Sequence, residues 1–396
     1  MSNFKDSHNS GSAYFIEGAG SLDAFVSSLA QTTNAADWPQ ADRIERNVPI
    51  YDGDLIRDVT GAARRGLMAE WARAFLDGPG IIVIKGAFSD TGALDRATAV
   101  FERIIEDQRQ TGQGGGDHFA KPGANDRVWN GLEKHCLADP ESFALYYGNT
   151  ILAMAAEAWL GPNYQVTAQV NRVNPGGTAQ TAHRDYHLGF MATAEAARYP
   201  AHVHQLSPAL TLQGAVAHCD MPLESGPTMY LPYSQRMAEG YIAFGRPEFQ
   251  DYFHEHHVQL PLAKGDAVFF NPALMHGAGS NVSQDIFRMA NLLQVSSAFG
   301  RAMEAMDRDV MARALFAPLH ALIAAGRLTA LQGGAAVAAC AEGYAFPTYL
   351  DTDPPVGGLA PASQADLMRD ALEAGRDVSE FEAAMDAWAL RRGAQG

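Results

Sequence analysis

The stretch KGDAVFFNPALMHGAGSN, at residues 264–281, decides the fold of this chain. Residues 264–266 read as a turn, and the apolar run at 267–270 has the composition of a buried strand. An Asn-Pro pair at 271–272 then turns the chain toward His276. The two glycines that follow would let the backbone come close to a group bound there. The pattern therefore predicts a strand that ends at a site around His276.

Other short apolar runs, also bounded by turn residues, lie before and after this stretch. Turn residues separate strand-like runs at 81–84, 164–174, 210–218, 228–231, 257–262 and 289–296. Helical patterns predict helices at 67–76, 89–109 (with Ser89 as its cap), 141–160, 363–374 and at the C-terminus, and a helical, Ala-rich region from 301 to about 345. The sequence therefore predicts a mainly β core, arranged as an antiparallel barrel or sandwich, with flanking helices.

A second motif, His183-Arg184-Asp185, follows the Pro-Gly loop at 174–177. In an extended segment residues 183 and 185 point to the same side, so both can bind one ion. With His276 they give two imidazoles and one carboxylate, the ligand set of non-haem Fe(II) oxygenases. Arg288, beyond the second histidine, suits the far carboxylate of a 2-oxo acid co-substrate.

On these motifs the chain resembles the phytanoyl-CoA dioxygenase family of Fe(II)/2-oxoglutarate oxygenases. The resemblance covers roughly residues 76–300 and runs through GIIVIKGAF, HRDYH, LESGPTMYLPYSQR, KGDAVFF and HGAGSN. It implies a double-stranded β-helix, a jelly-roll of the cupin type, over 76–300. An N-terminal extension, 1–75, and a helical C-terminal region, 301–396, would then pack on this core.

The same resemblance implies the cofactors and their ligands. Iron would be held by the catalytic residues His183, Asp185 and His276, and 2-oxoglutarate by Arg288, with Arg127 as a second basic contact. The expected reaction consumes O2 and 2-oxoglutarate, releases succinate and CO2, and hydroxylates a small metabolite. Related halogenases carry a small residue at the position of Asp185, so the carboxylate here favours hydroxylation.

Three further residues are candidates for contact with the substrate. His187 shares the side of Asp185 by strand parity, although packing on the barrel wall fits it equally well. Arg172 either points inward toward an anionic group or outward as a solvated charge. Trp129 is a candidate for the pocket wall. The histidines at 202–204 and 254–257 lie in polar stretches and are expected to be solvated or in loops.

Composition limits the partners of this chain. A formal net charge of −16 argues against nucleic acid or an anionic membrane, because phosphates bind Lys and Arg. The three cysteines form no CxxC pair, and no signal peptide or membrane-length apolar run is evident, which together predict a cytoplasmic enzyme. The oligomeric state stays open, a homo-oligomer included. The competing hypothesis is a cupin-like metal-binding barrel, either a binding protein or an isomerase, without oxygenase activity.

Overall fold

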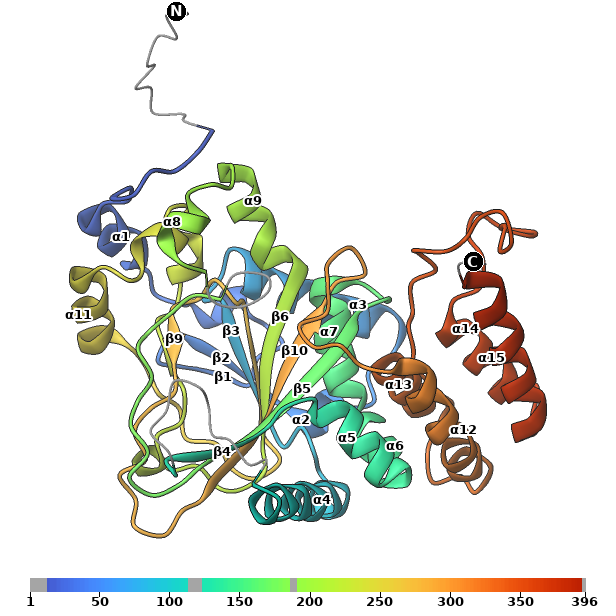
Figure 1. Ribbon diagram of the computed structural model, residues 1–396. Coiled ribbons are helices and arrows are strands. Elements are labelled where there is room, and N and C mark those ends of the chain that lie inside the picture. The colour runs from blue at the N-terminus through green and yellow to red at the C-terminus, as the bar shows by residue number, and fades with distance from the viewer. Residues whose placement is uncertain (1–12, 113–122, 186–190, 394–396) are drawn as a thin grey trace, which may run out of the picture.

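A mixed eight-stranded sheet forms the centre of the computed structural model, which describes residues 13–112, 123–185 and 191–393 (Figure 1). Its order is β1-β2-β3-β8-β6-β10-β5-β4; β2 and β3 run parallel and the other neighbours antiparallel. Strands β7 and β9 form a second, two-stranded sheet. The strands are β1 Arg43–Glu45, β2 Val48–Asp52, β3 Ile81–Lys85, β4 Asn125–Val128, β5 Gln165–Val173, β6 Thr211–Ala217, β7 Met229–Tyr230, β8 Ala267–Phe270, β9 His276–Gly277 and β10 Arg288–Ser296.

Most of the predicted strands are confirmed, and one is wrong. The runs at 81–84, 164–174, 210–218, 228–231, 267–270 and 289–296 correspond to β3, β5, β6, β7, β8 and β10. The segment 257–262 forms no strand but two isolated bridges, from Val258 to Tyr230 and from Leu262 to Met221. The two bridges pair this segment with two different parts of the chain, so the segment does not form a continuous ladder of hydrogen bonds with one strand.

Both faces of the large sheet are covered, and its strands differ in pattern. Strand β8, and β3 up to Lys85, are apolar runs, whereas β5 alternates polar residues such as Gln169 and Asn171 with apolar residues such as Ala168 and Val170. In β3, Ile82 and Ile84 belong to the core cluster on the helix-covered face. Ile81 and Val83 belong to a second cluster on the opposite face, together with Tyr230 of β7. The second face therefore looks toward β7 and β9, and the candidate site lies between the two sheets.

Helices α3, α5, α7 and α13 contact the strands β3, β5 and β6 on the first face, and α14 and α15 lie farther out (Figure 1). The core cluster on that face joins residues of α3–α7 with residues of α12–α15. The helices are α1 Leu22–Leu29, α2 Gly53–Ile56, α3 Gly61–Leu76, α4 Thr91–Gln110, α5 Gly131–Ala138, α6 Pro140–Tyr147, α7 Thr150–Leu160, α8 Thr193–Ala196, α9 Ala201–Leu206, α10 Gly240–Ala243, α11 Pro247–His256, α12 Arg308–Ala324, α13 Ala330–Cys340, α14 Gln364–Glu373 and α15 Val378–Arg392.

Two helix predictions need correction because of capping residues. The segment 141–160 is two helices, α6 and α7, since the Asn149 side chain accepts hydrogen bonds from the N–H groups of Ile151 and Leu152 and so begins a new helix. Asp90, and not Ser89, caps α4: its carboxylate accepts from Gly92 N at 2.8 Å. In both cases the residue that caps the helix has polar neighbours, and the spacing of apolar residues does not show which polar residue is the N-cap.

The two terminal regions take part in the core. Strand β2 pairs with β3, so residues before 76 extend the main sheet. From α12, Arg308 donates to Val166 O of β5 at 2.8 Å and to Cys340 O of α13 at 3.0 Å. Among the described residues no helix is long and apolar enough to cross a membrane.

Candidate metal centre

The backbone pairing of two separate segments brings His183 and His276 together. His183 N donates to His276 O at 2.9 Å, and His276 N donates to His183 O at 3.0 Å. This antiparallel bridge places the centres of the two imidazole rings 4.4 Å apart. Asp185 N donates to Pro272 O at 2.9 Å, which continues the pairing and turns Asp185 to the side of His183.

The three side chains offer atoms that fit one metal ion. One ligand atom from each of His183, Asp185 and His276 lies within 4.8 Å of the others. His183 Nε2 is 4.0 Å from Asp185 Oδ1, and His276 Nε2 is 3.8 Å from Asp185 Oδ2. These separations leave room for an ion between the three atoms, and the donor set is the one that non-haem Fe(II) sites use.

Backbone carbonyls fix the tautomer of both histidines. His183 Nδ1 lies 2.9 Å from Thr181 O, and His276 Nδ1 lies 2.7 Å from Leu274 O. A carbonyl oxygen only accepts, so each Nδ1 carries the proton and each Nε2 keeps its lone pair for a metal. Burial lowers the pKa of His276 to about 4, so this imidazole is neutral at ordinary pH.

Gln213 of β6 orients the carboxylate of Asp185. Its Nε2 donates to Asp185 Oδ2, the oxygen nearer to His276. On the backbone side, Tyr241 Oη donates to Asp185 O at 2.9 Å. No local pattern pointed to Gln213, because it lies on β6, a strand that is separate along the chain from the segment of Asp185.

Arg184, between the two ligands, points the opposite way and anchors the segment. Its guanidinium is buried over the Tyr241 ring at 4.9 Å and donates to the carbonyls of Gln235 and Met237. A Cβ at Gly240 would overlap this guanidinium, so only glycine leaves it room. The alternation expected of 183–185 is therefore observed, with Arg184 as a structural residue.

A cavity of about 410 Å³ opens beside the three candidate ligands. A small pocket of about 60 Å³ adjoins it, and the two share five lining residues: Asn171, Ala215, Thr228, Tyr230 and Leu292. Arg288 lines the small pocket and is buried, with no hydrogen bond or ion pair from its side chain within the described part of the chain. Burial lowers the pKa of Arg288 to about 10, so it remains a cation at neutral pH.

The other predicted residues divide into three groups. Arg127 and Trp129 line the large cavity, and the Arg127 guanidinium lies 4.8 Å from the centre of the Trp129 ring. Arg172 lies on the opposite face of β5, where it pairs with Asp126 at 3.0 Å, so it is not brought to the cavity. His187 lies outside the described residues.

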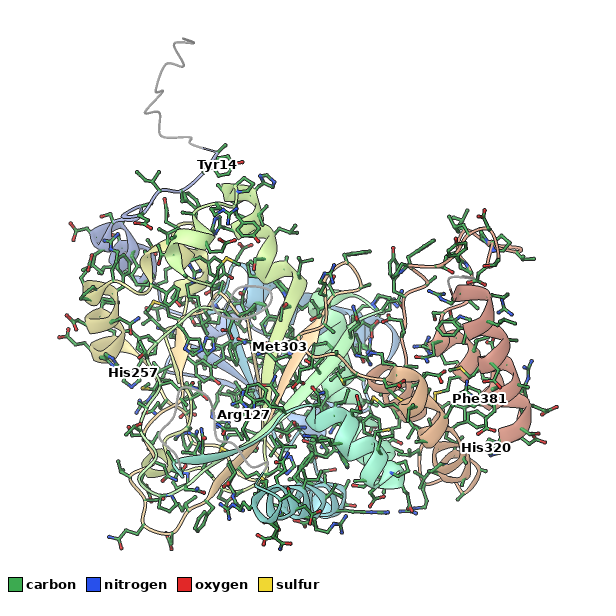
Figure 2. All side chains as sticks on the ribbon, in the orientation of Figure 1. Tyr14, Arg127, His257, Met303, His320 and Phe381 are labelled. Atoms are coloured by element: carbon green, nitrogen blue, oxygen red, sulfur yellow. The ribbon has the colours of Figure 1, made fainter. Side chains whose placement is uncertain are left out.

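Sequence reasoning missed several cavity residues besides Gln213, among them Gln180, Gln294, Tyr230 and Met303. Gln169 and Asn171, which alternate with Arg172 along β5 and so share one side of the strand, both line the cavity. Figure 2 shows Arg127 and Met303 near the middle of the molecule, and His257 at its edge. Among the described residues, His183, Asp185 and His276 are the one group with a metal-ligand arrangement.

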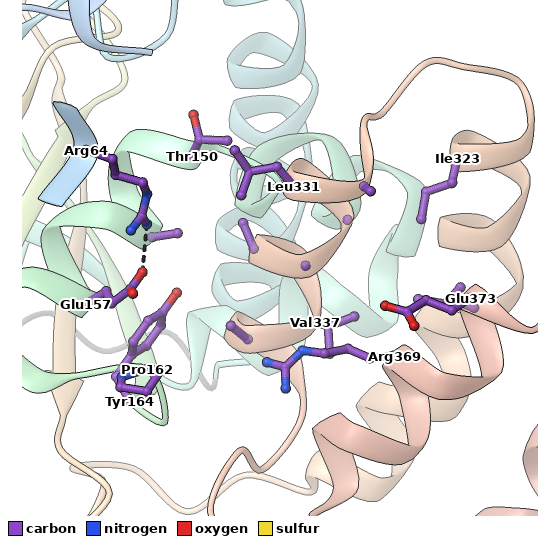
Figure 3. Close-up of a pocket in the computed structure, with 17 residues that line it drawn as sticks. Arg64, Thr150, Glu157, Pro162, Tyr164, Ile323, Leu331, Val337, Arg369 and Glu373 are labelled. Carbon is purple, nitrogen blue, oxygen red and sulfur yellow. Dashed lines mark hydrogen bonds and ion pairs between the residues drawn. The ribbon is translucent and has the colours of Figure 1, made fainter. Parts of the chain in front are cut away.

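A second cavity, of about 430 Å³, lies between α7 and the C-terminal helices α13 and α14 (Figure 3). Its lining is mostly apolar, with an ion pair between Arg64 and Glu157 at 2.7 Å. Its carboxylates are Glu157, which is paired with Arg64, and Glu373, and no histidine is among its described lining residues, so it lacks the imidazole ligands of the first cavity.

The comparison with protein families decides the relationship of this chain. Residues 76–290, more than half of the 396, match the family model described as phytanoyl-CoA dioxygenase (PhyH). The chain belongs to the phytanoyl-CoA dioxygenase family. A comparison with curated proteins gives no match. Fe(II) and 2-oxoglutarate are the cofactor and co-substrate of the phytanoyl-CoA dioxygenase family.

Among solved structures, the chain is similar to two enzymes from nogalamycin biosynthesis. One is the non-haem α-ketoglutarate-dependent epimerase SnoN, at 21% identity, over 60% of this chain and 84% of that one, with a TM-score of 0.41. The other is the carbocyclase SnoK, at 21% identity, over 61% and 88%, with a TM-score of 0.43. At these values neither likeness bears on the reaction or substrate of this phytanoyl-CoA dioxygenase family member.

Proposed function

We propose that this chain is an Fe(II)- and 2-oxoglutarate-dependent dioxygenase that hydroxylates a small metabolite and releases succinate and CO2. His183, Asp185 and His276 would hold the iron, and Arg288 would bind the far carboxylate of 2-oxoglutarate. When bound, iron supplies the oxidative chemistry, in which one atom of O2 enters succinate and the other enters the product. The protein supplies ligands, orientation and a cavity for this chemistry.

The buried guanidinium of Arg288 is the observation that carries this proposal. An unpaired cation in the interior is costly unless an anion meets it. Arg288 lines a pocket that continues into the metal cavity through Thr228 and Tyr230, and no carboxylate of the described chain pairs with it. A dicarboxylate fits this layout, with one end at the metal and the other on the guanidinium fork.

The residues around the metal would each do one task. His183 and His276 present Nε2 lone pairs, because their Nδ1–H groups are held by backbone carbonyls. Gln213 holds the carboxylate of Asp185 by one of its oxygens. The apolar ring of Phe270, 4.7 Å from the His276 ring, shields that ligand from water.

We also infer the finer architecture from these contacts. The second face of the main sheet and the pair β7–β9 would be the two halves of a double-stranded β-helix, with the metal centre between them. Residues 76–300 would be the catalytic unit, with 1–75 and 301–396 as additions. The support is the bridge from His183 to His276, which joins the segment before β6 to β9.

Anaerobic titration of the Fe(II)-loaded protein with 2-oxoglutarate tests the proposal. We expect the weak visible charge-transfer band of an iron–2-oxoglutarate complex, and we expect Arg288→Met to weaken 2-oxoglutarate binding by about 10–100-fold, the value of hydrogen bonds to a charged group. Arg172→Met is the matched control, since Arg172 pairs with Asp126 outside the cavity. Metal binding without a band would favour a cupin-like barrel that lacks oxygenase activity.

A further inference from the structure

Two arginines, Arg288 and Arg127, serve different parts of the site. Of these two spaces, Arg288 lines the small pocket and not the large cavity, and Arg127 lines the large cavity and not the small pocket. The residues common to both spaces, among them Asn171 and Tyr230, lie between them. On the proposed function, 2-oxoglutarate lies along these shared residues, from the metal to Arg288. Arg127, which the family resemblance implied as a second contact of 2-oxoglutarate, is then on the other side of the co-substrate.

Strand register supports this separation. In the β5 ladder, Arg127 of β4 is opposite Asn171, and Arg288 of β10 is opposite Val173. The Arg127 side chain does not turn toward Val173. Its Nη2 donates to Gln169 Oε1 at 2.6 Å, two residues along β5 in the other direction. The backbone positions of the two arginines therefore differ in register along β5, and the Arg127 guanidinium reaches away from the position of Arg288.

The wall around Arg127 suits a small molecule with one negative charge. Gln169 and Gln294 offer carboxamides, and Trp129 and Met303 offer apolar surface. Among the described lining residues Arg127 is the only cation, and Asp185, a candidate metal ligand, is the only carboxylate. Glu304, whose carboxylate accepts from Asn130 N at 2.7 Å, acts on Arg127 by its charge but does not line the cavity.

We propose that Arg127 binds the carboxylate of the substrate, and that the substrate is a small carboxylic acid rather than an acyl-CoA. The inference rests on the proposed function. A guanidinium offers a planar fork that matches one carboxylate, and the bond to Gln169 holds that fork in place. A CoA ester would bring several phosphate charges, and the described lining has a single cation for them.

The cavity volume agrees with this substrate class. About 410 Å³ is within the range of sites that enclose small molecules, and under the proposed function 2-oxoglutarate would fill part of it. The Trp129 ring lies under the Arg127 guanidinium at 4.8 Å, so an acid bound to Arg127 would place its carbon skeleton against Trp129 and Met303. Arg127 would thus set which carbon of the substrate faces the metal.

The test uses the full-length protein, loaded with Fe(II) and 2-oxoglutarate without oxygen so that no turnover occurs. The probes are benzoate, phenylacetate and hexanoate, each compared with its primary amide. Binding is followed by the change in the charge-transfer band and by the melting temperature. We expect at least one acid to bind about 10–100-fold more tightly than its amide, as a charged hydrogen-bond pair allows.

We expect Arg127→Met to lose this preference and to keep the affinity for 2-oxoglutarate. Arg127→Lys should keep part of the preference, since it keeps the charge and loses the fork. Arg109→Met is the matched control: Arg109 pairs with Asp126 and does not line the cavity. Urea denaturation of each variant checks that it folds, and the Lys variant supplies the comparison if the Met variant does not.

Three results would overturn the inference while leaving the proposed function intact. The first is equal binding of acids and amides to the wild-type protein. The second is a preference for acids that survives in Arg127→Met. The third is loss of the 2-oxoglutarate band in Arg127→Met, which would assign Arg127 to the co-substrate. If the wild-type protein forms no band at all, the proposed function fails and the inference fails with it.

Discussion

Replacement of Gln213 by Met should weaken metal binding without unfolding the protein. Gln213 Nε2 donates to Asp185 Oδ2, and that oxygen is 3.8 Å from His276 Nε2. Met has nearly the length of Gln and keeps the packing of β6, but it cannot hold the carboxylate. Loss of such a partner typically costs 10–100-fold in metal affinity, which is about 1.4–2.8 kcal/mol.

The assay is an anaerobic titration of the metal-free protein with Co(II), followed by its visible absorption, and repeated with Fe(II) in competition with a chelator. Gln294→Met is the matched control. Gln294 lines the same cavity, and no bond from its side chain to His183, Asp185 or His276 is present in the described chain. Urea denaturation of both variants shows whether their folding free energy has changed.

Wild-type metal affinity in Gln213→Met would refute the reasoning, because it would mean that backbone pairing alone orients Asp185. An equal loss of affinity in Gln294→Met would refute it in another way. The effect would then come from the polarity of the cavity and not from the bond to Asp185.

Three further predictions concern stability. Burial lowers the pKa of His218 from 6.5 to about 3, so between these pH values only the unfolded chain takes up the proton. The free energy of unfolding should therefore fall by about 1.4 kcal/mol for each pH unit below the pKa of the unfolded chain. In urea titrations from pH 7 to 5, His218→Gln should reduce that slope. Gly240→Ala should displace the buried guanidinium of Arg184 and lower both the melting temperature and the metal affinity; unchanged values would contradict the anchoring role. A chain ended at Gly300 should fail to fold, since α12 and α13 belong to the main core; cooperative unfolding of that fragment in urea would contradict this.

Local sequence was enough to predict the metal-ligand candidates and most strands. His183 and Asp185 are two residues apart, and extended backbone alternates its side chains, so their common side follows from the sequence alone. The turn at 264–266 and the run 267–270 predicted β8 because short-range propensities agree there. The family resemblance over 76–300 likewise came from short motifs, and the family match at 76–290 confirms it.

Other features depended on contacts between distant segments. Parity separated Arg172 from Asn171, but only the packing of the sheets decided that Asn171 faces the cavity and Arg172 pairs with Asp126. The bond from Gln213 to Asp185 joins two segments that no local pattern connects.

The sequence by itself determined which residue types could bind a metal and a dicarboxylate, since those depend on short spacings and side-chain chemistry. The tertiary structure decided that Arg288 is buried with no anionic partner in the described part of the chain, that Arg127 turns toward Gln169, and that β2 and α12 belong to the core. The physical reason is that burial and charge pairing depend on the arrangement of all elements around a side chain, whereas strand periodicity depends only on its neighbours in the chain.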